Sequence, residues 1–178
     1  PIFVAAALRP LGAVLRTPRS LNTEVGMPVT ILSSTGGEAA WVLEMAMRGR
    51  GEIAYLADVA KPGVGVITNV SGAHLERLGS IEEIAHAKGE LFAGLGPDGI
   101  AIMPADDPLI HAEAAPVAPA RRIVFDGAGR ARLPVDVRLL EVIPAGAAGS
   151  VVRLAARGTP VVVRLPLGGA HNARNAAA

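Results

Sequence analysis

Short apolar runs alternate with helical spacing along the first part of the chain. Apolar runs at 40–47, 64–70, 99–103 and 121–125 are typical of strands buried on both faces of a parallel sheet. Helices are predicted from about Glu52 to before Pro62 and from near Ser80 onward. A two-residue alternation then predicts antiparallel strands at 135–143, 151–155 and 160–165. We therefore expect an α/β fold, with a mostly parallel Rossmann-like sheet flanked by helices and a small antiparallel β-meander.

The remaining segments are less regular. Residues 1–8 have the composition of the interior of an element, and the polar, turn-rich stretch 16–28 is predicted to be a loop. In that loop Asn22 and Thr23 can either contact a ligand or cap the segment that follows from Val25, and capping is the commoner role. The last residues, 168–178, pass from a glycine-rich loop into the start of a helix, a natural place for nucleotide contacts.

Lys88 is unusual for its position in a predicted helix. Ser80 and Glu83 have capping-box spacing, which places the start of that helix close to Ser80. At helical spacing Lys88 then falls on the apolar stripe, four residues after Ile84 and four before Phe92. Such a lysine must extend its ammonium to water, pair with a carboxylate, or lose its charge, because desolvation lowers its pKa. The first outcome is the commoner one, and the last would provide a reactive amine.

Further polar side chains follow the predicted strands. Glu44 lies near the end of the run 40–47 and is either a metal ligand or the ion-pair partner of Arg48 or Arg50. His74 lies in the loop after the run 64–70, at the strand end where α/β sheets bind ligands. Glu44, His74 and Lys88 together suggest a Mg²⁺–phosphate site. The pair 106–107, two aspartates, is predicted to cap a helix.

Composition narrows the class of protein. The 178 residues are 51% hydrophobic but only 3% aromatic, so the expected core is aliphatic. The chain has no cysteine, which excludes disulfides and thiolate metal sites and is compatible with the cytoplasm. Its net charge of +1 and its scattered basic residues give no basic patch for nucleic-acid binding. No apolar run is long enough to predict a membrane-spanning helix. We expect a monomer.

Five motifs resemble those of the Mur ligase family, in order and spacing: SLNTEVGMPVT, EMAMRGRGEI, GVITNVSGAHLERLGSIEEIAHAKGELF, ADDP and GAHNARNAA. The similarity covers nearly the whole chain. It is to the central ATP-binding domain of these ligases, and within the family to the MurF type. It implies a P-loop NTPase-like fold in which Glu44, His74 and a carbamylated Lys88 hold Mg²⁺. Asn22 and Thr23 would then face the UDP-sugar peptide. The residues near the adenosine of ATP would be His171, Asn172 and Asn175, with Asn172 the most direct contact.

The resemblance also implies an activity. It indicates an ATP-dependent ligase of peptidoglycan precursor synthesis that adds D-Ala-D-Ala to UDP-MurNAc-tripeptide through an acyl phosphate. Three other hypotheses stay open: a sister ligase such as folylpolyglutamate synthase, a non-catalytic module that binds a nucleotide or a partner, and an inactive excerpt. The substrates are small molecules in both ligase hypotheses.

The sequence departs from the family pattern at several points. Neither Lys61 nor Lys88 is followed by Ser or Thr, so the chain contains no phosphate-binding Gly-Lys-Ser/Thr loop. We expect that loop to precede Pro1 and a carboxyl-terminal domain to follow Ala178, so that 1–178 is a truncated central domain, inactive by itself. Ala46 replaces an expected glycine, and a proline at 104 replaces an expected asparagine.

Overall fold

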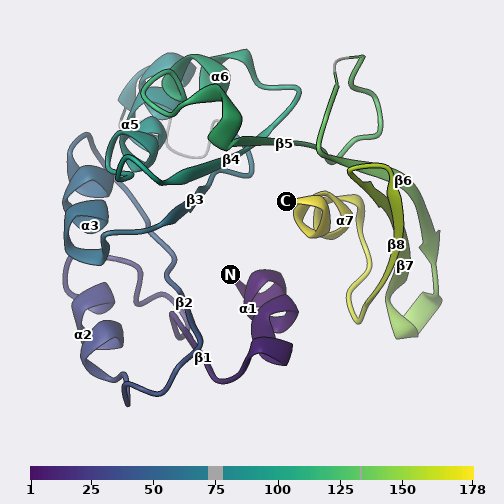
Figure 1. Cartoon of the computed structure of the whole chain (residues 1–178), viewed down its shortest axis with the longest axis horizontal. Helices are drawn as coiled ribbons and strands as arrows, with labels where there is room; N and C mark the ends of the chain where they lie inside the picture. The colour runs from purple at the N-terminus through teal and green to yellow at the C-terminus, as the bar shows by residue number, and fades with distance from the viewer. Residues whose placement is uncertain (72–77, 133) are drawn as a thin grey trace.

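The computed structural model describes residues 1–71, 78–132 and 134–178. Its strands form a curved row that is covered by helices on both sides (Figure 1). Helices α2, α3, α5 and α6 lie on the outer side of the curve, and α1 and α7 lie on the inner side. The bounds of these helices are Ile2–Leu8 (α1), Gly26–Leu32 (α2), Glu52–Ala60 (α3), Ile81–Ala93 (α5), Pro108–Glu113 (α6) and Ala170–Ala177 (α7).

The strands confirm the predicted mixture of parallel and antiparallel pairing. Strands β1 (Val14–Arg16) and β2 (Ala40–Val42) form a two-stranded parallel sheet. A six-stranded sheet begins with four parallel strands and ends with two antiparallel ones, in chain order. These strands are β3 (Val64–Val66), β4 (Ile100–Pro104), β5 (Arg122–Asp126), β6 (Val137–Pro144), β7 (Ser150–Ala156) and β8 (Thr159–Leu165). The β-meander is therefore β6–β8, joined directly to the parallel strands.

Three predicted elements were wrong in extent. The strand predicted at 64–70 ends at Val66. The predicted strand 40–47 ends at Val42, because the backbone N–H groups beyond it bond to the loop after β1. Glu44 N donates to Thr17 Oγ1 at 2.9 Å, and Ala46 N donates to Asn22 O at 2.8 Å. The predicted loop 16–28 also runs into α2, whose first turn tolerates the proline at 28. The helix predicted from about Glu52 to before Pro62 and the helix start predicted near Ser80 were correct, and Ser80 Oγ accepts from Glu83 N at 3.2 Å.

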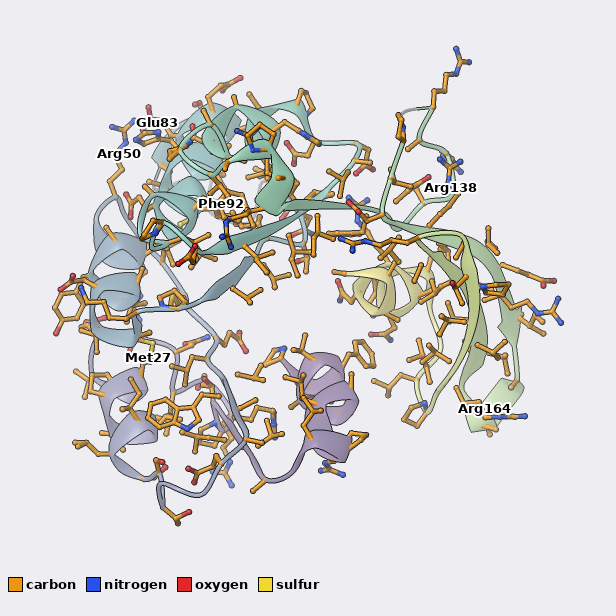
Figure 2. All side chains as sticks on the ribbon, viewed as in Figure 1. Met27, Arg50, Glu83, Phe92, Arg138 and Arg164 are labelled. Carbon is orange, nitrogen blue, oxygen red and sulfur yellow. The ribbon has the colours of Figure 1, made fainter. Side chains whose placement is uncertain are left out.

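Three hydrophobic clusters hold the layers together. One packs α5 and α6 against β3 and β4 and contains Phe92, which Figure 2 labels beneath α5. A second lies under α2, α3 and α5, and Met27 is buried in it. The third joins α7 and the meander around Phe125. Because α7 is held by the third cluster, the meander positions the helix on which the predicted nucleotide contacts lie.

Asp126, at the end of β5, allows a test of stability. Burial raises the pKa of its carboxyl, but backbone N–H donors in the next loop outweigh this and bring the pKa below its ordinary value. Two of these donors are Ala128 N at 3.1 Å and Ala131 N at 2.7 Å. Because the folded pKa is depressed, this stabilisation is present above the unfolded pKa of about 3.9 and is lost as pH falls through the folded value.

We expect Asp126→Asn to lower the free energy of unfolding by about 1–2 kcal/mol at pH 7, since the carboxylate accepts charge-assisted hydrogen bonds that the amide cannot equal. The difference from the parent chain should shrink in acid. Urea unfolding at pH 7 and near pH 3 measures both values. Asp58→Asn is the control, because the Asp58–Lys61 pair is exposed and should change stability little. A deficit that persisted unchanged in acid would contradict the role of the ionised carboxylate.

Candidate functional site

The candidate site lies where the parallel strands of the large sheet end. Because β3, β4 and β5 are parallel, the residues after each strand share one edge of the sheet. Asn69 follows β3, Asp106 and Asp107 follow β4, and Gly127 follows β5. The N-cap role predicted for the two aspartates is confirmed for Asp107, whose Oδ1 accepts from Ile110 N at 3.3 Å. Asp106 instead has a partner on α7.

Lys88 reaches this edge from α5. Its side chain is half-buried, and its Nζ donates to the carbonyl oxygen of Asn69 at 2.7 Å. Burial lowers the pKa of Lys88 below its ordinary value, and the charge of Asp107 opposes part of that shift. The predicted position of Lys88 on the buried side of the helix is therefore confirmed. The carbonyl of Asn69 fixes where the amine lies, and sequence reasoning had no signal for it.

Glu44 lies beyond β2, in the segment held by the loop after β1. Asn22 Nδ2 donates to Glu44 Oε1 at 3.2 Å, so two of the predicted site residues are brought together. Thr23 lies just before α2, and its Oγ1 accepts from the backbone N of Gly26, the first residue of that helix, at 3.3 Å, which agrees with the capping alternative. No ion pair between Glu44 and an arginine occurs within 1–71, 78–132 and 134–178.

Arg50, one of the two arginines considered for Glu44, binds a different carboxylate. It donates through Nε and Nη2 to Glu83 at 2.5 and 2.6 Å. Figure 2 labels the two side chains next to each other on the outer surface, where α3 begins close to α5. The alternative prediction, in which Glu44 pairs with Arg50, is therefore wrong. The carboxylate of Glu44 is bonded instead to the side-chain amide of Asn22.

The Glu44 segment and the residues after β3 share one hydrophobic cluster. Leu43 and Met45, which flank Glu44, pack against the buried cluster that contains Met27 and Ile84. Val70, the residue after Asn69, packs against the same cluster. The stretch with Glu44 and the stretch with the Lys88 acceptor thus pack on one hydrophobic cluster. His74 lies outside the described residues, and among those described no three His, Cys, Asp or Glu side chains gather as a metal site.

Helix α7 carries the three predicted nucleotide contacts. His171 and Asn175 are exposed, and Asn172 Nδ2 donates to Gly168 O at 2.7 Å. Between them Arg174 extends to Asp106, with Nη2–Oδ1 at 2.8 Å and Nη1–Oδ2 at 3.2 Å. This pair joins α7 to the edge of the sheet on which Lys88 lies. Sequence reasoning missed Arg174, because its partner lies 68 positions away and no local pattern connects them.

The two departures from the family pattern take structural roles here. Ala46 is half-buried and donates its N–H to Asn22 O at 2.8 Å. The proline at 104 is buried as the last residue of β4, and its carbonyl oxygen accepts from His111 Nε2 at 3.0 Å.

Comparison with known proteins decides the family. The model of the Mur ligase middle domain matches residues 2–178. The chain belongs to the Mur ligase family. A relative of this middle domain, UDP-N-acetylmuramoyl-tripeptide–D-alanyl-D-alanine ligase of Synechocystis sp., is 46% identical over 108 residues, which are 61% of this chain and 24% of the relative. This Mur ligase domain thus spans about a quarter of the length of that relative.

Solved structures agree with this assignment. Crystal structure I of MurF from Acinetobacter baumannii matches with a TM-score of 0.84 and 28% identity, over 97% of this chain and 37% of the other. MurF ligase of Thermotoga maritima in complex with ADP matches with a TM-score of 0.80 and 30% identity, over 98% of this chain and 40% of the other. A more distant structure, the G51S mutant of L. casei FPGS, has a TM-score of 0.59 at 20% identity over 78% of this chain and 31% of the other, so it shows the fold alone.

The described helices of this Mur ligase domain are short relative to the thickness of a membrane. None of them combines the length and the apolar character needed to cross one.

Proposed function

We propose that this domain serves in an ATP-dependent ligase that joins D-Ala-D-Ala to UDP-MurNAc-tripeptide, forming the amide bond through an acyl phosphate. The observation that carries the proposal is the position of Lys88. In a chain of the Mur ligase family, the amine of Lys88 lies at the carboxyl edge of β3 with its pKa lowered by burial. Relatives and solved structures named as MurF ligases support the substrate pair. We place this ligase in the cytoplasm as a monomer that acts on small molecules.

The donor chemistry fits Mg²⁺. Magnesium prefers oxygen ligands and is usually held by one or two carboxylates together with phosphate oxygens. Glu44 offers one such carboxylate, which the amide of Asn22 orients through a single oxygen. The described residues provide no complete set of ligands, so Glu44 would hold the ion together with His74 and a carbamate on Lys88. ATP with bound Mg²⁺ supplies the phosphoryl group and offsets its negative charge.

Lys88 provides the second anion by reacting with CO₂. Burial lowers the pKa of Lys88 and so raises the share of neutral amine, whose lone pair can attack the carbon of CO₂. The N–C bond forms, one proton leaves the nitrogen, and the product carbamate carries one negative charge. Asn69 O, the present acceptor of Lys88 Nζ, holds the amine at the edge of the sheet. Arginine could not take this role, because its guanidinium stays protonated.

The other predicted residues bind and orient the substrates. Asn22 fixes Glu44, and the loop that contains Asn22 and Thr23 would face the UDP-MurNAc-tripeptide. His171 and Asn175 are exposed on α7, where they can meet an adenosine, and Asn172 lies between them at the start of that helix. Catalysis is then a matter of positioning the tripeptide carboxylate for phosphorylation and excluding water from the acyl phosphate.

The ligase that carries this domain can be tested with defined substrates. With UDP-MurNAc-tripeptide, D-Ala-D-Ala, ATP and Mg²⁺, we expect one ADP per molecule of ligated product, followed by mass spectrometry and a coupled assay for ADP. Omission of D-Ala-D-Ala, or addition of a metal chelator, should stop product formation. A folate with glutamate serves as the alternative pair of substrates. Turnover of that pair alone would contradict the peptidoglycan assignment, and ATP binding without any product would indicate a non-catalytic module.

A further inference from the structure

The side chain of Arg174 connects α7 to the ends of two strands. Its two terminal nitrogens form a fork on the carboxylate of Asp106, which follows β4. Its stem lies over Gly127, which follows β5, because a Cβ at Gly127 would lie 2.5 Å from Arg174 Cγ and 3.1 Å from Arg174 Cα. Only glycine allows the helix so close to the sheet at this point. Arg174 is thus fixed both by packing and by paired hydrogen bonds.

The rest of α7 has few directional contacts. Ala173 and Ala177 are its buried residues, and they pack on the cluster around Phe125. Methyl groups offer little shape that would define how far a helix is rotated or shifted along its axis. A bidentate arginine–carboxylate pair defines both, because two parallel hydrogen bonds fix the direction of the guanidinium. The Arg174 Nε is buried without a partner in the described part of the chain. The carboxylate of Asp106 is therefore what holds the Arg174 guanidinium in place.

We infer that Arg174, held by Asp106, is a positioning residue for the nucleotide contacts of α7. The inference rests on the proposed role of that helix in binding adenosine. Arg174 lies one turn or less from His171, Asn172 and Asn175, so any rotation of α7 displaces all three. The same fork ties the helix to the strand end that precedes Asp107, whose charge acts on Lys88. The Arg174–Asp106 pair therefore fixes the position of α7 relative to the edge of the sheet on which Lys88 lies.

The variants Arg174→Met and Asp106→Asn test this role. Methionine keeps an apolar stem over Gly127 but has no fork, and asparagine keeps the shape of Asp106 without its charge. We expect amide hydrogen exchange within α7 to become about tenfold faster in each variant, while the melting temperature falls by only about 3 °C. In the ligase assay the KM for ATP should rise about tenfold, equivalent to about 1.4 kcal/mol, with kcat little changed.

Two comparisons separate positioning from general destabilisation. The double variant should show no larger increase in α7 exchange or in the KM for ATP than either single variant, because both changes remove the same bidentate pair. Arg174→Lys should not restore the KM, since an ammonium cannot form the bidentate pair. Arg153→Met is the matched control: it breaks an exposed pair with Glu141 on β6 and β7 and should leave exchange in α7 and the KM for ATP unchanged.

Unchanged exchange in α7 would overturn the inference, and so would additive effects in the double variant. If the parent protein neither binds nor uses ATP, the proposed function fails. The exchange measurement then decides by itself whether Asp106 and Arg174 hold the helix, so the two failures are distinguishable.

Discussion

Replacing Lys88 with arginine should abolish ligase activity, lowering kcat/KM at least about a thousandfold, an effect comparable to the loss of a principal electrostatic group. Arginine keeps the positive charge and can still reach Asn69 O, but it cannot lose a proton or take up CO₂. A guanidinium placed where the domain is proposed to hold Mg²⁺ would repel the ion. The expected outcome is therefore loss of turnover in a folded protein.

The chain offers a matched control for this change. Its only other lysine, Lys61, ends α3 on the surface and pairs with Asp58. Lys61→Arg should change kcat/KM less than about twofold, as is usual for an exposed pair. The carbamate has its own readout, since a sample supplied with ¹³C-bicarbonate should give a carbamate carbon signal that is absent in Lys88→Arg and kept in Lys61→Arg. Full activity of Lys88→Arg would refute the role of this lysine.

The sequence predicted the elements that depend on local chemistry. The start of α5 follows from Ser80 and Glu83, and α6 starts at the cap of Asp107, because a cap needs only residues within one turn. The meander was predicted by alternation, which is also local. By contrast, the run 40–47 has the composition of a strand but ends early. Its partners, Thr17 and Asn22, lie more than twenty residues earlier and compete for its backbone.

The candidate site was predictable only where one residue was anomalous in its own element. Lys88 interrupts an apolar stripe, so its burial could be expected from periodicity, and its lowered pKa has burial as its main cause. The contact of Asn22 with Glu44 and the fork of Arg174 on Asp106 join distant segments. Each of these residues looks ordinary in its local sequence, and only the tertiary fold brings each pair together.

The turn between β6 and β7 of the meander gives the largest expected effect on stability. Gly149 lies between β6 and β7 with φ of +94°, and a Cβ built there would be 2.0 Å from Leu165 O and 2.7 Å from Leu167 N. These are backbone atoms, so no side-chain rotation can relieve the overlap. We expect Gly149→Ala to cost more than about 4 kcal/mol of unfolding free energy, a large share of the about 5–15 kcal/mol of a typical domain.

Gly146, in the same turn, is the control that separates backbone strain from overlap. Its φ is +58°, but a Cβ there would meet nothing within 4 Å. Gly146→Ala should therefore cost only about 1–2 kcal/mol, the strain of a left-handed residue. Urea unfolding of both variants measures the difference, and equal costs would show that contact with Leu165 does not matter. Because Leu165 packs in the cluster that holds Ala173 and Ala177, Gly149→Ala should also release α7 and speed its amide exchange.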